Sequence, residues 1–565
     1  MNKVFGSAMI KGYQGNNMGD AFHIAACMKH FTGYGAAVSG KDRTYAWIPD
    51  RELREYYLPQ YAEAIKNGAM TIMINSAGFN GIPAHANKQL LTGILKGEMG
   101  FQGLVVSDWE DVKYLTSRHK VAASYKEAVK IAINAGIDMG MVANDLEFTQ
   151  YLIELIKSGD IPMTRINDAV RRILRVKMLL GLFEKTRDPL TNYPKFGGEE
   201  FRQTSLEAAR EALVLTKNQN NTLPLIKSFK VLVVGPTATS IRSLNGGWTN
   251  TWQGEKSNEV YAAKNTILEA IQQKVGTDKV TYFEGANFDQ LTNLDEAVRA
   301  AANNEYTSIV LCLGEQSYTE VPGTINDLTL DAHQIELALA LAKTGKPVVL
   351  VLAEGRPRII SAFEDKMSAV LLSIYPGMEG GEAIADVLFG DVNPSGKLPL
   401  TYPRYANGIV PYDHAYLEGL DESTGYPGGK EKFYDPQYEF GWGLSYSKFE
   451  YKNLTVNKPV FDKTESIEIS VQVTNAGARE GKEVVQLYVN DLFASIAPPV
   501  KRLRGFQKIT LKAGETQTVT FKLSFQDLAF VGLDNKWVVE PGAFKAMVGG
   551  LSADFELKKP VVKVT

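Results

Sequence analysis

A carboxylate stands at the end of one apolar, strand-like run in the first part of the chain. The run Leu104–Val106 is followed by Ser107 and then by Asp108 and Trp109. In a parallel α/β barrel the carboxyl ends of the strands form the active-site face. A carboxylate there can attack the anomeric carbon of a sugar, and a neighbouring indole can stack on the sugar ring. The same local pattern also fits an aspartate that caps the next helix, so the pattern alone leaves both interpretations open.

Two other apolar runs end in polar or sulfur-containing side chains. Lys29 and His30 follow the run Ile24–Met28, and their donor groups suit sugar hydroxyls. A histidine with only a structural role fits this position equally well. Met73 and Asn75 lie at the end of the next run, at an equivalent level, and give a weaker signal.

Two glutamates lie on a loop after a later apolar run. The run Ser308–Leu313 opens at Gly314 into a loop that carries Glu315 and Glu320. A glutamate on a surface loop is most often simply solvated, so this pattern needs support from elsewhere. The histidines show no spacing typical of a metal site, and the sequence has no nucleophile elbow or Walker loop. These residues therefore favour hydrolysis by two carboxylates, and we expect neither a cofactor nor a metal.

The first region of the chain, residues 1–187, contains the segments that must position Asp108. Short apolar runs alternate there with amphipathic segments of helical spacing. The runs are Ile24–Met28, Met70–Ile74, Leu104–Val106 and Ile137–Met141, and the helical segments include Arg51–Lys66 and Tyr125–Ala135. Strands roughly 30 to 45 residues apart, with helices between them, indicate βαβ units and a parallel sheet. Residues 188–198, rich in Pro, Asn and Gly, are interpreted as a linker.

The rest of the chain predicts two further domains. Residues 199–403 again alternate strands and helices and form a second α/β domain. Its strands are predicted at Val231–Val234, Ser308–Leu313, Val348–Leu352 and Ala369–Leu372, with a helix at Ala332–Lys343. Residues 404–448 form a loop-rich connector. Residues 449–565 show short alternating strands without helices, which indicates a β-sandwich.

Composition excludes some partners. The 565-residue chain has a formal net charge of -3 and a pI of about 6.2, with no basic footprint for nucleic acid. No run reaches the roughly 18 apolar residues of a membrane helix, and no signal peptide is visible. Cys27 and Cys312 lie in apolar runs and are interpreted as inert thiols. We expect no nucleic-acid partner and no membrane span, and a homodimer remains open.

A series of motifs along nearly the whole chain resembles glycoside hydrolase family 3. They are Lys29-His-Phe-Thr-Gly-Tyr-Gly35, Gly81-Ile-Pro-Ala-His-Ala-Asn87, Gly100-Phe-Gln-Gly-Leu-Val-Val-Ser-Asp108-Trp109, Ala135-Gly-Ile-Asp-Met-Gly-Met141, Gly246-Gly-Trp-Thr-Asn-Thr-Trp252-Gln-Gly254, Gly314-Glu-Gln-Ser-Tyr-Thr-Glu320 and Gly390-Asp-Val-Asn-Pro-Ser-Gly-Lys-Leu-Pro399. Within the family, the chain most resembles bacterial and plant exo-acting glucan β-glucosidases. The resemblance implies a TIM-type barrel, then an α/β sandwich domain, then a fibronectin type III-like domain.

The resemblance also implies a retaining mechanism with two carboxyl groups. Asp108 matches the nucleophile that forms a glycosyl-enzyme, and Glu320 matches the acid/base. Because these two residues belong to different domains, the resemblance places the active site at a domain interface. The implied substrate-binding residues are Lys29, His30 and Met73 at the −1 sugar, and Trp109 and Trp252, which would sandwich the +1 sugar.

The implied activity is hydrolysis of terminal β-D-glucosyl residues of glucans or gluco-oligosaccharides. Residues Val38–Arg43 contain no second histidine after the Lys29-His30 motif, unlike hexosaminidase-type members, and Trp109 favours a glucosidase. The alternatives are a β-xylosidase or arabinosidase of the same family, or a non-catalytic sugar-binding protein. The family suggests a periplasmic or extracellular location.

The first region departs from the family in its length. A (β/α)8 barrel needs roughly 250 residues, whereas residues 1–187 carry the nucleophile-bearing part, with the Lys29-His30 strand close to the start. We therefore expect an incomplete barrel, N-terminally truncated relative to the family. An Asp and an Arg that the family uses to grip the −1 sugar have no match in this chain.

Overall fold

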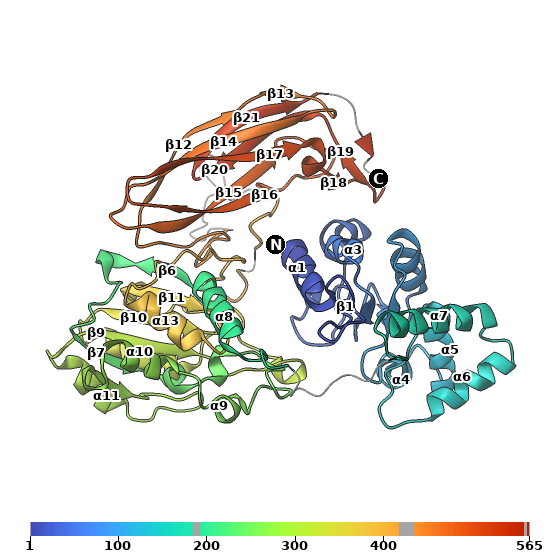
Figure 1. Cartoon of the computed structure of the whole chain (residues 1–565), viewed down its shortest axis with the longest axis horizontal. Helices are drawn as coiled ribbons and strands as arrows, with labels where there is room; N and C mark the ends of the chain where they lie inside the picture. Colours follow the sequence, from blue (N-terminus) through green and yellow to red (C-terminus); the bar gives the residue numbers. More distant parts are fainter. Residues whose placement is uncertain (1, 185–192, 409, 417–433, 559–561, 564–565) are drawn as a thin grey trace, which may run out of the picture. The chain divides into compact units, whose positions relative to one another are not determined.

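The computed structural model (Figure 1) describes residues 2–184, 193–408, 410–416, 434–558 and 562–563. The predicted linker 188–198 and connector 404–448 lie partly outside these residues. The chain divides into two compact units. The first comprises Met1–Pro194 and Phe530–Trp537, and the second comprises Lys195–Ala529 and Val538–Thr565.

The first unit contains a parallel sheet with the strand order β1-β2-β5. Its strands are β1 (Cys27–Phe31), β2 (Thr71–Ile74) and β5 (Leu104–Val106), with a short hairpin of β3 (Gly78–Phe79) and β4 (Ile82–Pro83). Three of the predicted strands are confirmed, the first of them a few residues later than expected. The predicted parallel pairing is also confirmed, since β1 pairs with β2 and β2 with β5 in parallel.

The prediction of a strand at Ile137–Met141 is wrong. Only a single parallel bridge forms there, between Met139 and Val106. The carboxylate of Asp138 accepts the backbone N–H of Val105 at 3.0 Å and pairs with Lys96 at 2.7 Å. A side chain thus occupies a ladder position, and this shortens the pairing with β5.

Helical segments precede, separate and follow these strands along the chain. They are α1 (Asn2–Gln14), α2 (Asp50–Glu52), α3 (Pro59–Lys66), α4 (Asp111–Ser117), α5 (Tyr125–Ala135), α6 (Glu147–Lys157) and α7 (Met163–Leu179), with the 3-10 turn η3 (Ala84–Ala86) and the π-helical segments η2 (Leu53–Tyr57) and η4 (Gln89–Glu98). The predicted helix Tyr125–Ala135 is confirmed. The predicted helical segment Arg51–Lys66 is confirmed, but it is divided into α2, η2 and α3, and α3 begins at Pro59, which lacks a backbone N–H.

The second unit contains a six-stranded sheet with the order β6-β11-β10-β9-β7-β8. Its strands are β6 (Val214–Asn218), β7 (Lys230–Val234), β8 (Val280–Phe283), β9 (Tyr306–Gly314), β10 (Val348–Ala353) and β11 (Ala369–Ser373). All pairs are parallel except that of β6 with β11, which is antiparallel. The four predicted strands are confirmed. The two edge strands, β6 and β8, were not predicted.

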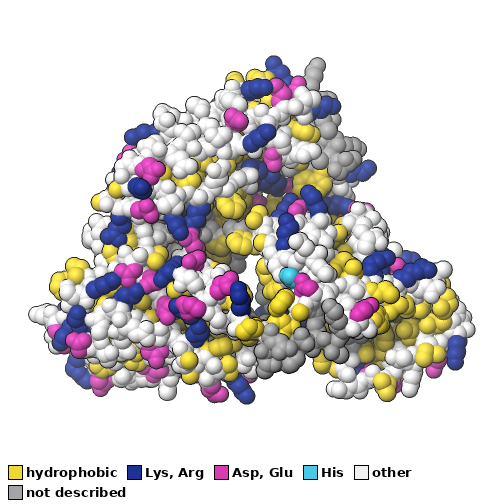
Figure 2. Space-filling model, in the orientation of Figure 1, with side chains coloured by type: hydrophobic (Ala, Val, Ile, Leu, Met, Phe, Trp, Pro, Cys, Tyr) yellow, Lys and Arg dark blue, Asp and Glu magenta, His cyan; other side chains and the backbone are white. Residues whose placement is uncertain are grey.

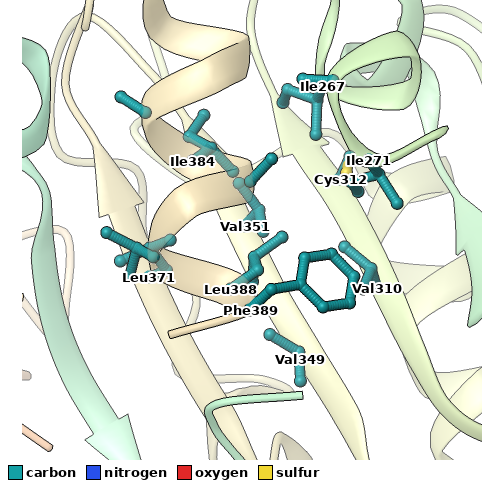
Figure 3. Close-up of a cluster of buried hydrophobic side chains, with 14 of the residues drawn as sticks. Ile267, Ile271, Val310, Cys312, Val349, Val351, Leu371, Ile384, Leu388 and Phe389 are labelled. Atoms are coloured by element: carbon teal, nitrogen blue, oxygen red, sulfur yellow. The ribbon is translucent and has the colours of Figure 1, made fainter. Parts of the chain in front are cut away.

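Helices cover both faces of this sheet. They are α8 (Glu199–Ala212), α9 (Ser257–Val260), α10 (Ile267–Val275), α11 (Leu294–Ala302), α12 (Ala332–Ala342) and α13 (Gly380–Leu388). Helices α8, α10 and α13 share one face, and α11 and α12 pack with the other. Figure 3 shows Ile384 and Leu388 of α13 over Val351 and Leu371 of the strands. Central strands with apolar residues on both faces are the expected form of a buried parallel sheet.

The C-terminal part is a β-structure with period-2 burial. Its strands are β12 (Phe449–Val456), β13 (Val460–Phe461), β14 (Ser466–Asn475), β15 (Gly481–Asp491), β16 (Arg502–Leu511), β17 (Thr516–Ser524), β18 (Phe530–Val531), β19 (Trp537–Val539), β20 (Gly542–Val548), β21 (Leu551–Leu557) and β22 (Val562–Lys563). One sheet has the order β12-β14-β17 and another the order β13-β21-β20-β15-β16. Strand β14 alternates buried Ile467, Ile469, Val471 and Val473 with less buried residues, as predicted for a sandwich.

Helix α7 of the first unit has an apolar stripe on its exposed side. Val170, Leu174 and Met178 are spaced four residues apart and are 44%, 41% and 65% exposed. Figure 2 shows hydrophobic side chains gathered over the helices α5–α7. A stripe of this kind is typical of a surface that another structural element covers. Among the described residues, no helix is both long and apolar enough to span a membrane.

A substitution at Gly314, the last residue of β9, can test how closely β9 and β10 pack in the second sheet. Gly314 has a φ of 148°, and a Cβ on it would overlap the carbonyl oxygen of Ala353 on β10. We expect Gly314→Ala to lower the free energy of unfolding by about 3 kcal/mol or more, from backbone overlap and strain together. Gly345→Ala is the matched control, because Gly345 has a φ of 77° but open space around it. Gly345→Ala should lower the free energy of unfolding by only about 1 kcal/mol. Equal losses in urea unfolding would contradict this account.

Candidate active site

The structure brings Asp108 and His30 together at the carboxyl ends of β5 and β1. The Asp108 Oδ2 atom lies 3.6 Å from His30 Nε2, and the two side chains are only 13% and 18% exposed. The backbone N–H of Trp109 donates to Asp108 Oδ1 at 2.6 Å. One backbone donor and one imidazole ring therefore face a carboxylate that retains a small opening to solvent. This is a suitable setting for a carboxylate nucleophile.

Lys29 lies beside His30 on an irregular part of β1. The pairing of β1 with β2 shifts register between Met28 and Phe31. Irregularities of this kind re-aim side chains at strand ends. Lys29 is exposed, whereas the His30 ring lies 4.8 Å from the ring of Tyr34. Lys29 and His30 thus project from β1 at the point where its regular pairing with β2 is interrupted.

Three other predicted residues of the first unit take different positions. Met73 is partly exposed near the end of β2. Asn75 is buried, and its amide donates to the Thr32 carbonyl at 2.9 Å while its oxygen accepts the Ala77 N–H at 2.9 Å. Asn75 therefore holds the strand ends together. Trp109 is 56% exposed, so its indole is accessible for stacking.

Sequence reasoning missed a buried network behind Asp108. The backbone N–H of Asp108 donates to His85 Nε2 at 3.2 Å, and His85 Nδ1 lies 3.7 Å from Asp111 Oδ2. Ser76 donates its hydroxyl to Asp111 Oδ1 at 2.8 Å, and Arg118 lies 3.8 Å from the same oxygen. Two features of the sequence could have indicated this network. His85 lies within the motif Gly81–Asn87, and Asp111 follows Asp108 by three positions.

Burial sets the charge state of this network. It lowers the pKa of His85 to about 3, with help from nearby His119. Burial, and then the negative charge of Asp108, raise the pKa of Asp111 to about 8. At neutral pH the imidazole is therefore neutral, with its ring proton on Nδ1 because Nε2 accepts. Asp111 is then largely protonated and adds little negative charge beside Asp108.

The second unit holds the other predicted residues on two loops. Glu320 follows β9 in a half-buried position, with φ 53° and ψ −143°. A positive φ is uncommon for a residue with a side chain and occurs preferentially at functional sites. Trp252 is 45% exposed, and its carbonyl accepts the Trp248 N–H at 2.8 Å.

The other loop glutamate, Glu315, holds the fold. Its Oε1 atom accepts the Tyr318 hydroxyl at 2.6 Å and the Gly355 N–H at 2.9 Å, and its Oε2 atom lies 3.6 Å from Arg358. These contacts occupy Glu315 within the second unit. Glu315 therefore has a structural role in this loop. The described residues contain no group of three or more His, Cys, Asp or Glu side chains that could hold a metal ion.

Three protein-family models match the chain. Residues 1–176 match the glycosyl hydrolase family 3 N-terminal domain, and residues 213–446 match the C-terminal domain of that family. Residues 483–552 match a fibronectin type III-like domain. The predicted fold class, a parallel α/β region followed by a second α/β domain and a fibronectin type III-like domain, is confirmed.

Several known proteins are similar over almost the whole chain. A lysosomal beta glucosidase of Dictyostelium discoideum is 40% identical, over 97% of this chain and 68% of its own length. A beta-xylosidase of Formosa agariphila is 38% identical, over 98% of this chain and 78% of its own length. The crystal structure of a beta-glucosidase from Listeria innocua in complex with gluconolactone has a TM-score of 0.91 at 32% identity, covering 99% of this chain and 78% of its own.

The buried carboxyl group of Asp111 gives the first unit a predictable pH dependence. Its folded-state pKa of about 8 is raised above that of an unfolded aspartate, near 4. The stability that it contributes is therefore complete below about pH 4 and lost as the pH rises towards 8. Between pH 5 and 8 we expect the parent to lose on the order of 3–4 kcal/mol relative to Asp111→Asn, which mimics the protonated acid.

Thermal unfolding at several pH values, followed by circular dichroism, measures this difference. Asp160→Asn is the control, because Asp160 is exposed and hydrogen bonds from Lys130 and then Ser158 lower its pKa. That variant should follow the parent across this pH window. A parallel pH dependence for Asp111→Asn and the parent would show that Asp111 is ionised in the folded chain.

Proposed function

Since the chain belongs to glycoside hydrolase family 3, we propose that it is a retaining exo-β-glucosidase. It would remove terminal non-reducing β-D-glucosyl residues from glucans or gluco-oligosaccharides by double displacement. The observation that carries this proposal is the setting of Asp108, a strand-end carboxylate fixed by Trp109 N–H and facing His30. The β-glucosidases among its relatives support the choice of sugar.

Asp108 is the proposed nucleophile. The hydrogen bond from Trp109 fixes the carboxylate rotamer, so that the reacting oxygen is held in place before the sugar arrives. Its main-chain N–H is held in turn by His85, which has no charge of its own at neutral pH. The attack forms a covalent glycosyl-enzyme and expels the leaving alcohol.

Glu320 is the proposed acid/base. As a general acid it protonates the leaving oxygen, and as a general base it then activates the water that hydrolyses the glycosyl-enzyme. Lys29, His30 and Met73 are proposed to contact the sugar in the −1 position. Trp109 and Trp252 supply exposed indoles for the +1 sugar. Stacking tolerates several linkages, so broad linkage specificity follows.

A β-xylosidase is the second candidate, because a relative of that name is 38% identical. Release of glucose from cellobiose or laminaribiose, against xylose from xylobiose, separates the two activities. Sugar binding without turnover would instead support a non-catalytic protein. A homodimer and the absence of a nucleic-acid partner stay predictions, which sedimentation of the purified chain can test.

Asp108 should be the residue labelled by a mechanism-based inactivator. A 2-deoxy-2-fluoro glucoside with a good leaving group forms a glycosyl-enzyme that hydrolyses slowly, so peptide mass spectrometry can locate it. Asp108→Asn should abolish the label and lower kcat by roughly 10⁴-fold, the scale on which loss of a catalytic group acts. A label on any other carboxylate would refute this role.

Glu320→Ala should slow substrates according to their leaving groups. Cellobiose turnover should fall about 10²- to 10⁴-fold, because its leaving alcohol needs protonation. A dinitrophenyl β-glucoside should lose much less in its first step, and azide should rescue the second step and give a β-glucosyl azide. Glu315→Gln is the control, since Glu315 contacts only residues of the fold in the hydrogen bonds above. It should show neither the leaving-group split nor azide rescue. An α-azide product would exclude the proposed role of Glu320.

A further inference from the structure

Two loops of the second unit are joined by one glutamine side chain. Loop 246–254 carries Trp252, and loop 315–323 carries Glu320. The Gln253 side chain donates from Nε2 to the Thr319 carbonyl at 3.1 Å, and its Oε1 accepts the Thr319 N–H at 3.0 Å. Gln253 thus pairs with both backbone groups of the residue immediately before Glu320.

The backbones of the two loops also approach closely. A Cβ on Gly247 would lie 2.5 Å from the Thr319 Cβ, and one on Gly254 would lie 2.8 Å from the Ser317 hydroxyl. The Ser317 hydroxyl donates to the Gln253 carbonyl at 2.6 Å. Glycine is therefore required at positions 247 and 254, where loop 246–254 comes closest to Thr319 and Ser317. The two loops form one packed assembly within a single unit.

Other contacts hold loop 315–323 at positions away from Glu320. Arg242 donates to the Ser317 hydroxyl at 3.0 Å and to the Ser317 carbonyl at 3.1 Å. Arg356 donates to the Tyr318 hydroxyl at 2.5 Å and to the Gly323 carbonyl at 2.5 Å. The loop is fixed before and after Glu320 by arginines. Gln253 holds the peptide groups of the adjacent residue.

We propose that Gln253 is a positioning residue that aims Glu320 and couples it to Trp252. This inference rests on the proposed function. Glu320 has a positive φ, and the direction of its side chain depends on the position of the Thr319 peptide groups before it. The two hydrogen bonds from the Gln253 side-chain amide hold those peptide groups in place. Gln253 directly follows Trp252, so the same residue restrains the backbone beside Trp252 and beside Glu320. A leaving sugar stacked on Trp252 would therefore lie at a fixed distance from the Glu320 carboxyl group, which protonates the glycosidic oxygen.

The kinetic test compares Gln253→Ala with Thr251→Ala. Thr251 lies on the same loop, and the side-chain hydrogen bond described for it goes to Glu255. For Gln253→Ala we expect kcat on cellobiose to fall about 10- to 100-fold, the scale of a small misplacement of a catalytic group. The dinitrophenyl β-glucoside should lose less than about threefold in its first step, because its departure needs little protonation. Thr251→Ala should match the parent on both substrates.

A purely structural role for Gln253 would give equal losses on both substrates, and that result overturns the proposal. A rise in KM for cellobiose with unchanged kcat also overturns it, because Gln253 would then serve only Trp252. If Gln253→Ala does not fold, Gln253→Glu provides the same comparison. It keeps an acceptor for the Thr319 N–H and removes the donor to the Thr319 carbonyl.

Hydrogen exchange gives a reading that does not depend on turnover. The Thr319 amide should exchange at least about tenfold faster in Gln253→Ala and unchanged in Thr251→Ala, because exchange follows local opening. An unchanged exchange rate in Gln253→Ala would show that Gln253 does not restrain the loop, and it would refute the proposal. A parent chain that folds but hydrolyses neither glucoside would refute the proposed function, and exchange would still decide whether Gln253 restrains the loop.

Discussion

Parallel strands that are buried on both faces leave only their ends as places where a polar side chain can meet a ligand. In the first unit His30, Asn75 and Asp108 follow or close β1, β2 and β5. In the second unit Glu315 follows β9 and Glu354 follows β10. In the second unit, the hydrophobic effect that buries the strand interiors therefore also gathers polar groups at the carboxyl edge of the sheet. In the first unit β5 follows the same pattern, whereas β1 exposes Cys27 and Lys29 along its length. The carboxyl edges of the sheets are therefore the places where ligand-binding side chains are expected, whatever the reaction.

Each edge contains buried ionisable groups that support the exposed ones. In the first unit Asp111 lies behind Asp108, and its raised pKa keeps a second negative charge away from it. In the second unit Glu354 is fully buried and accepts the hydroxyl of Tyr402 at 3.0 Å. Burial raises the pKa of Glu354 well above its usual value, and the charge of Glu315 adds to the effect. Both units thus place a carboxyl group of raised pKa next to an acidic residue of the sheet edge, and a raised pKa favours the neutral form, which limits repulsion between the two.

Sequence patterns predicted most of the strands, because a buried parallel strand is a continuous apolar run. The strand-end pattern made Asp108 a candidate but fitted a helix cap equally well, and the proposed roles of Asp108 and Glu320 come from the resemblance to the family. The network of His85 and Asp111 could not be predicted in this way, since its contacts join η3 to α4 across residues distant in sequence. The same holds for Gln253, whose role depends on two hydrogen bonds to Thr319. Strands β6 and β8 were missed because the polar residues of edge strands weaken the apolar signal.

The two carboxyl groups that we propose to be catalytic are supported in different ways, and the difference matches the proposed chemistry. Asp108 is held by its own strand, by the Trp109 N–H and by the bond of its main chain to His85. A nucleophile must meet one carbon along one line of attack, so a position fixed by strand register suits it. Glu320 lies on a loop and must act in two steps, first on the leaving oxygen and then on a water molecule. A loop restrained through the neighbouring peptide group fixes the backbone position from which the glutamate carboxyl group would reach both oxygens.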